Sequence, residues 1–208
     1  MNEDIDLVKL EKATFRTANQ DGLTELWMGL MILAIALLLI HTVFVGIVAI
    51  LIIFQAMFNE KIKEKFTYPR IGKVKLLGEA EMPSGYGWIL VAVTMILAFA
   101  SVMFSARYEN ELVLLIARWA PALAGIGLIQ PSAYLVSKSG LNRYYGIGIV
   151  SSILGVVFTL LEFPTAVSRM TVYMAIVGGL FILAGIASLA RFVRKYPVLD
   201  LEEMSDEQ

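Results

Sequence analysis

Residues 59–83 read NEKIKEKFTYPRIGKVKLLGEAEMP and form the only long polar interval in a chain of otherwise nearly continuous apolar side chains. The interval holds six of the 17 Lys and Arg residues. Basic residues close to a membrane-spanning segment resist translocation, so a loop of this kind stays on the cytoplasmic face. The interval therefore predicts the orientation of the apolar segments on both sides of it.

The composition of the whole chain is typical of a membrane protein. Hydrophobic residues make up 58% of the 208 residues and charged residues only 17%, against about 25% charged residues in soluble domains. The mean hydropathy is +0.74. We therefore expect an all-α, polytopic integral membrane protein, and the net charge of −1 gives no sign of a nucleic-acid partner.

Six membrane spans are predicted if the first apolar stretch forms a hairpin. As a single helix, residues 23–58 would reach about 54 Å, whereas the hydrocarbon core of a bilayer is about 30 Å thick. We therefore expect two short arms, roughly 23–40 and 43–58, with Thr42 as the cap of the second arm. Four further apolar segments complete the set, at 85–104, 112–136, 144–161 and 171–192.

These spans predict one membrane domain with both termini in the cytoplasm. Its parts are an amphipathic segment, a first hairpin, the basic loop, two further hairpins and an acidic tail: 1–22, 23–58, 59–83, 84–136, 144–192 and 193–208. This arrangement places 14 of the 17 basic residues inside and two in the outer turns, a strong bias of the expected sign. MILAIA at 31–36 recurs as MILAFA at 95–100, which three tandem hairpins or a restricted apolar alphabet would both explain.

The fourth span contains a charged residue, Arg118. A charge at the bilayer centre costs about 2.5–3.5 kcal/mol on insertion scales, so the side chain needs a partner, water or an interface. We expect it to pair with Glu162 at the outer end of the fifth span or with Glu111 on its own helix. The alternatives are a contact with a transported ion or solute, and an arginine that reaches the outer surface.

The same span contains residues that interrupt helices. Pro121 lies three residues after Arg118, and Gln130, Pro131 and Tyr134 follow in the inner half. Broken spans in transporters free backbone groups that bind solute. Prolines in membrane helices also occur without such a role, so both interpretations stay open.

Within the basic interval, residues 66–72 read FTYPRIG and include Tyr68, Pro69, Arg70 and Gly72. The segment resembles one in a family of uncharacterised prokaryotic small polytopic membrane proteins, in which Tyr-Pro-Arg-Ile-Gly lies in an inner loop after a membrane hairpin. The resemblance implies the same placement in this chain and no known activity.

The sequence also predicts where this inner loop docks. Asp21 and Glu25 stand one helical turn apart at the inner end of the first span, on the same side of the membrane as Arg70. A guanidinium can bind a carboxylate through two parallel hydrogen bonds, so we expect Arg70 to contact Asp21 or Glu25. In the alternative, the basic residues of the loop contact only anionic lipid.

The chain lacks the residues on which most catalytic and metal sites depend. It has no cysteine, and its single histidine, His41, cannot form a cluster. No span contains aspartate, and no H-E-x-x-H, G-x-S-x-G or P-loop pattern is present. We therefore expect no enzyme activity, no metal and no cofactor; a lipid-modifying enzyme that uses Glu25, Tyr68 and Arg70 has no motif behind it.

Two functions stay open at this point. The first is a small transporter or channel for an ion or solute in the plasma membrane, acting as an oligomer, for which Arg118 and the broken fourth span are the reason. The second is a non-transporting membrane module, such as an assembly factor or a regulatory subunit, that presents residues 59–83 to a partner protein or to anionic lipid head groups. The expected partners are the bilayer, a second copy or another membrane protein, and no nucleic acid.

Overall fold

A computed structural model of the chain describes residues 16, 19–71, 86–108 and 110–197. Over these residues every regular element is a helix and none is a strand, which confirms the all-α prediction. The elements are α2 (Leu23–Ile40), the short 3₁₀ helix η1 (Thr42–Phe44), α3 (Val45–Phe66), α4 (Tyr68–Ile71), α5 (Tyr86–Ser105), α6 (Glu111–Gly127), α7 (Ile129–Ser139), α8 (Arg143–Leu160) and α9 (Ala166–Lys195).

Most of these helices are of membrane length. Five segments are long and apolar enough to cross a bilayer: Leu23–Ile40, Thr42–Arg70, Glu111–Ser139, Arg143–Leu160 and Ala166–Lys195. Within α5 a shorter apolar helix is found, Ala92–Ser105. The number of six spans stays a prediction. Three predicted parts lie at least partly outside the described residues. They are the amphipathic segment except residues 16 and 19–22, the basic loop from Gly72 onward, and the acidic tail from residue 198.

The second helix is longer than the apolar run predicted. α3 continues through Phe66, so the first eight residues of the polar interval are helical, and Lys63 and Lys65 lie in its last turn. Glu and Lys are good helix formers, and lysines near a helix C-terminus interact favourably with the helix dipole. Pro69 then falls in the first turn of α4, where a missing N–H costs nothing.

The turn between α2 and α3 has a different cap from the expected one. His41, not Thr42, caps η1, and its Nδ1 accepts a hydrogen bond of 3.1 Å from the backbone N–H of Val43. A histidine nitrogen can accept this bond in the same way as a serine or aspartate oxygen, because the residue has extended backbone angles.

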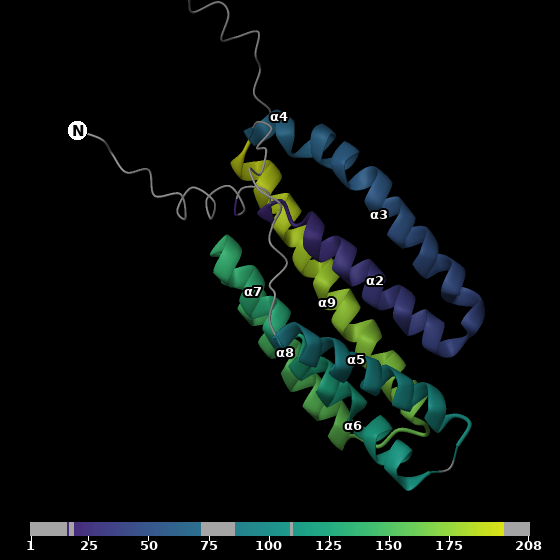
Figure 1. Cartoon of the computed structure of the whole chain (residues 1–208). Helices are drawn as coiled ribbons and strands as arrows, with labels where there is room; N and C mark the ends of the chain where they lie inside the picture. Colours follow the sequence, from purple (N-terminus) through teal and green to yellow (C-terminus); the bar gives the residue numbers. More distant parts are fainter. Residues whose placement is uncertain (1–15, 17–18, 72–85, 109, 198–208) are drawn as a thin grey trace, which may run out of the picture.

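The helices pack into one bundle whose most extensive contact joins segments far apart in the sequence (Figure 1). α2 packs along α9, and α6 lies between α5 and α8. The contacts of α2 with α3 and of α8 with α9 are much less extensive. The first and third predicted hairpins are therefore not the packing units of the fold, whereas α5 and α6 do pack together.

Glycines allow the closest of these contacts. A Cβ atom on Gly29 would lie 2.8 Å from the carbonyl oxygen of Gly178, and one on Gly22 would lie 2.5 Å from that of Gly185. Gly22 and Gly29 are seven residues apart, and so are Gly178 and Gly185. Seven residues is two turns of helix, so the two contacts form one continuous seam between α2 and α9. Small residues permit this approach of two backbones in a membrane, where no hydrophobic effect drives association.

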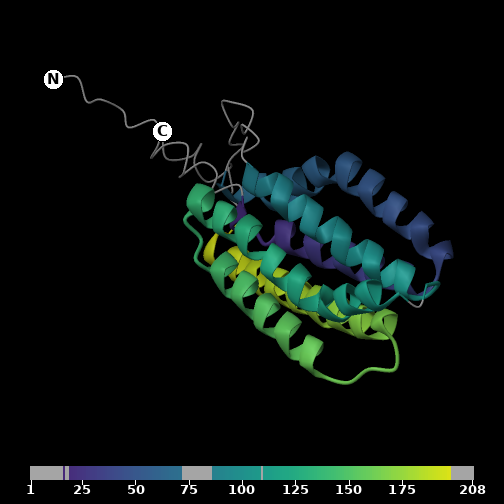
Figure 2. The same ribbon diagram turned by 60° about the horizontal axis from the view of Figure 1, so that its bottom comes forward.

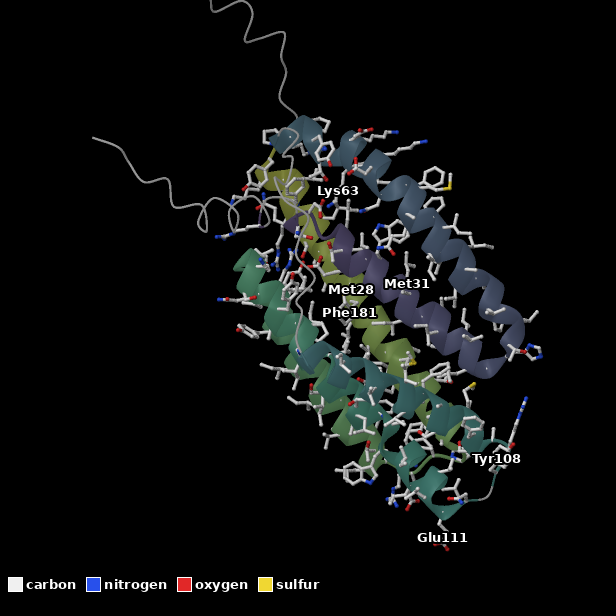
Figure 3. All side chains as sticks on the ribbon, viewed as in Figure 1. Met28, Met31, Lys63, Tyr108, Glu111 and Phe181 are labelled. Atoms are coloured by element: carbon white, nitrogen blue, oxygen red, sulfur yellow. The ribbon has the colours of Figure 1, made fainter. Side chains whose placement is uncertain are left out.

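The core lies where α2, α5, α6, α8 and α9 meet, and it includes Val102, Ala117, Phe158, Tyr173 and Phe181. α3 contributes no buried residue and lies at the edge of the bundle (Figure 2). Figure 3 shows Lys63 at one end of the bundle and Glu111 at the opposite end. We call these the Glu25 end and the Arg118 end, after the charged residues discussed below.

Candidate functional site

Two fully buried carboxylates lie at the Glu25 end, where α2 begins. Asp21 and Glu25 each have no exposed surface. The Oδ1 atom of Asp21 accepts a hydrogen bond of 3.1 Å from the backbone N–H of Leu23, in the first turn of α2. A positive φ of 80° at Gly22 lets the chain turn sharply between this carboxylate and the helix.

Asp21 joins α2 to the end of α3. Its Oδ2 atom accepts a hydrogen bond of 3.0 Å from the hydroxyl of Thr67, and Thr67 is itself almost fully buried. Thr67 belongs to the FTYPRIG segment, so this segment does dock on the start of the first helix. The contact is made by a neutral hydroxyl that sequence reasoning did not select.

The predicted docking of Arg70 is wrong. Its Nη1 atom donates a hydrogen bond of 2.6 Å to the carbonyl oxygen of Phe66, and within the described residues it forms no ion pair with Asp21 or Glu25. The last carbonyls of a helix have no intrahelical partner and attract cations, which explains why Arg70 turns back onto the end of α3. Tyr68 and Pro69 are half-buried beside it.

Glu25 pairs with Arg143 instead. The Nε atom of Arg143 lies 2.6 Å from Glu25 Oε1, and the arginine side chain is 27% exposed. Its Nη2 atom donates to the carbonyl oxygen of Asn19 at 2.5 Å, and its guanidinium lies 5.3 Å from the ring centre of Tyr144. These contacts tie the start of α8 to the start of α2 and the residues just before it, across more than 115 residues of sequence.

Arg143 also borders a cavity between α8 and α9. The cavity has a volume of about 350 Å³, at the lower end of the ~300–1,000 Å³ range of small-molecule sites. Arg143, Ser188 and Arg191 line it toward the Glu25 end, and apolar residues line it toward the middle of the bundle, among them Ile147, Val150, Leu180 and Ala184. The cavity is therefore cationic at one end and apolar at the other, and we call it the α8–α9 groove.

At the opposite end, the predicted ion pair of Arg118 is absent. Arg118, Glu111 and Glu162 are all exposed, and within the described residues Arg118 pairs with neither carboxylate. Glu111 is seven residues away on the same helix, a rise of about 10 Å. Glu162 follows Leu161, whose extended backbone turns the chain away from α8.

The fourth predicted span is less broken than expected. Pro121 is buried inside α6, which continues past it to Gly127, and the interruption falls at Leu128. Gln130 and Pro131 are the second and third residues of α7, where proline is tolerated because first-turn N–H groups have no intrahelical acceptor.

The residues expected to line a transport path do not meet in either of the two main cavities. Gln130 and Tyr134 are half-buried, and the Tyr134 carbonyl accepts a hydrogen bond of 2.8 Å from Ser137. A second cavity, of about 550 Å³, lies among α2, α5, α6 and α9, and its lining is almost entirely apolar. Neither Arg118 nor Gln130 lines this cavity or the α8–α9 groove.

The described residues contain no group of three or more His, Cys, Asp and Glu side chains that could hold a metal ion. Comparison with known proteins finds no matching family model, no matching curated protein and no matching solved structure. The resemblance noted for residues 66–72 therefore stays a prediction, and the geometry of the bundle carries the functional argument.

Proposed function

We propose that this chain is a non-transporting integral membrane protein that binds an anionic lipid in the α8–α9 groove. In this proposal it crosses the cell membrane six times, with the Glu25 end and both termini in the cytoplasm. The observation that carries the proposal is the position of Arg143 and Arg191 at one end of a groove whose other lining residues are mostly apolar.

The chemistry of the groove matches a phospholipid. Guanidinium groups bind phosphate through paired, charge-assisted hydrogen bonds, and apolar walls below them suit an acyl chain. Arg191 is exposed, and no carboxylate of the described residues pairs with it. Among the described residues its charge is therefore open to a ligand.

The position of the groove along the bundle supports the same ligand. Lys61 and Lys63 lie at the same end, on the last turns of α3. Lysines next to a span attract anionic lipid with about 1 kcal/mol each. They would raise the local concentration of anionic lipid at this end of the bundle.

Transport stays a second hypothesis for an oligomer of this chain. It depends on Arg118 and Gln130 facing a hydrated path, and neither lines the α8–α9 groove or the apolar cavity among α2, α5, α6 and α9. The buried hydroxyls of Ser101 and Thr159 and the half-buried hydroxyl of Ser152 donate to backbone carbonyls instead. A second copy would have to complete any path.

Native mass spectrometry of the full-length protein tests the lipid proposal. We expect the protein to retain phosphatidylglycerol in preference to phosphatidylcholine, because only the former carries a net negative charge. Ala184→Trp fills the groove and should remove one bound phosphatidylglycerol from the distribution. Leu183→Trp is the matched control, because Leu183 is exposed on the same helix and does not line the groove.

A second pair of variants tests the charge. Arg191→Gln should lower phosphatidylglycerol retention, whereas Arg194→Gln should leave it unchanged, because Arg194 is exposed on the same helix outside the groove. Equal retention by the groove variants and their controls, or equal retention of both lipids, would overturn the proposal.

A further inference from the structure

Arg118 and Arg169 lie at the other end of the bundle from the α8–α9 groove. We infer that these two arginines form a binding site for a phosphate-type anion at the start of α9. The anion could be the phosphate of a lipid head group or free phosphate, since both present the same oxygen atoms. This inference does not depend on the function proposed above.

Arg169 is a buried cation, and no carboxylate of the described residues neutralises it. Only 9% of its surface is exposed, and its Nε atom is buried without a hydrogen-bond partner. Buried arginines are normally paired, because removing an unpaired charge from water is costly. Within the described part of the chain no carboxylate lies at ion-pair distance from it.

Arg118 adds a second charge of the same sign near Arg169. Arg118, on α6, acts electrostatically on Arg169, and the two helices are in contact. Like charges repel, and salt screens this repulsion less at partly buried sites than at exposed ones. An anion held between the two guanidinium groups would turn the repulsion into two attractions.

The start of α9 adds further positive potential. Arg169 is the fourth residue of this 30-residue helix. Helical side chains lean toward the N-terminus of their helix, and the Arg169 guanidinium indeed lies 5.9 Å from the ring centre of Phe163, which precedes the helix. The guanidinium therefore extends toward the first backbone N–H groups, where the helix dipole favours anions.

Thr165 and Ser168 occupy part of this helix start. They form a capping box, in which the Thr165 hydroxyl accepts a hydrogen bond of 3.0 Å from the Ser168 N–H and Ser168 Oγ accepts one of 3.3 Å from the Thr165 N–H. The box leaves the N–H groups of Ala166 and Val167, which have no intrahelical acceptor in a first turn, for an anion.

Thermal unfolding of the full-length protein in a neutral detergent tests the site. In a low-salt gluconate buffer, Arg118→Gln should raise the melting temperature, because it removes the repulsion of Arg169. Added sodium phosphate should stabilise the wild type more than sodium chloride at equal ionic strength. Arg118→Gln and Arg169→Gln should each raise the apparent Kd for phosphate about tenfold, as expected for the loss of a hydrogen bond to a charged group.

Arg107→Gln is the matched control, because Arg107 is exposed at the same end of the bundle. It should keep the wild-type phosphate response. Short-chain phosphatidylglycerol and phosphatidylcholine micelles separate the two anion sources: a response to phosphatidylglycerol alone assigns a lipid head group, and a response to phosphate as well assigns any phosphate group.

Two results would overturn the inference. The first is a fall in the melting temperature of Arg118→Gln in gluconate, since this would show that a carboxylate of the chain already neutralises the pair. The second is a melting temperature of the wild type that does not change with phosphate or phosphatidylglycerol. A stabilisation that Arg118→Gln and Arg169→Gln retain to the same extent as Arg107→Gln would count equally against it. The exposed Arg118 keeps the test valid if Arg169→Gln does not fold.

Discussion

Replacing Gly155 by alanine should destabilise the bundle, because α6 and α8 are in backbone contact at this residue. A Cβ atom on Gly155 would lie 2.3 Å from the carbonyl oxygen of Pro121. Ordinary contact begins at about 3.4 Å, so the two helices would have to separate locally by about 1 Å. Overpacking of this kind costs about 1–3 kcal/mol.

The matched control is Gly146→Ala on the same helix, where a Cβ atom would meet nothing within 4 Å. Alanine favours a helix over glycine by about 0.8–1.0 kcal/mol, and this gain is the same in both variants. We therefore expect Gly155→Ala to be less stable than Gly146→Ala by about 1–3 kcal/mol. Reversible unfolding in mixed detergent micelles measures the difference, and equal stabilities would refute the close approach of α6 and α8.

Two further predictions concern the buried ion pair and the topology. Removing one partner of a buried pair costs about 3–5 kcal/mol, so Glu25→Ala and Arg143→Ala should each lower the free energy of unfolding strongly. The double variant should lose less than the sum of the two single losses, whereas the losses of Glu25→Ala and Arg70→Ala should add. Strict additivity of Glu25→Ala and Arg143→Ala would contradict the Glu25–Arg143 contact. In intact cells, a single cysteine introduced at Lys63 or Ser205 should resist an impermeant thiol reagent that labels one at Asn110, and equal labelling would rule out six spans with cytoplasmic termini.

The sequence predicted the apolar helices well and their ends less well. The bounds of α2 match the predicted first arm because its apolar run stops at both ends where the helix stops. α3 outlasts its apolar run because Glu60, Lys61 and Lys63 favour a helix without being hydrophobic. Hydropathy indicates which residues can lie within the bilayer, whereas the end of this helix is determined by helix propensity and by Pro69.

Helix pairing was harder to predict than the helices themselves. Ala175 and Gly179 are small residues of α9 spaced four apart, about one turn, a pattern that favours a close helix contact. In the structure Gly178 and Gly185 face α2, whereas Gly179 meets nothing within 4 Å. Adjacent residues of a helix point about 100° apart, so only the position of the partner helix decides which glycine is used.

For the site, the sequence identified the buried acids and missed their partners. Asp21 and Glu25 stood out because carboxylates at the start of an apolar span need compensation. Arg70 and Arg143 were both on the expected side of the membrane, and charge alone does not distinguish them. The α2–α9 and α6–α8 contacts, which the sequence does not encode locally, bring Arg143 rather than Arg70 next to Glu25.

The two arginines of the α8–α9 groove should therefore contribute differently to lipid binding. Arg143 is already fixed by Glu25 and by the Asn19 carbonyl, so a ligand would not have to immobilise its side chain. Arg191 is exposed, and binding would order a side chain that carries about 2 kcal/mol of rotamer entropy. Loss of Arg143 should consequently lower both the stability of the bundle and lipid retention, whereas loss of Arg191 should lower lipid retention alone.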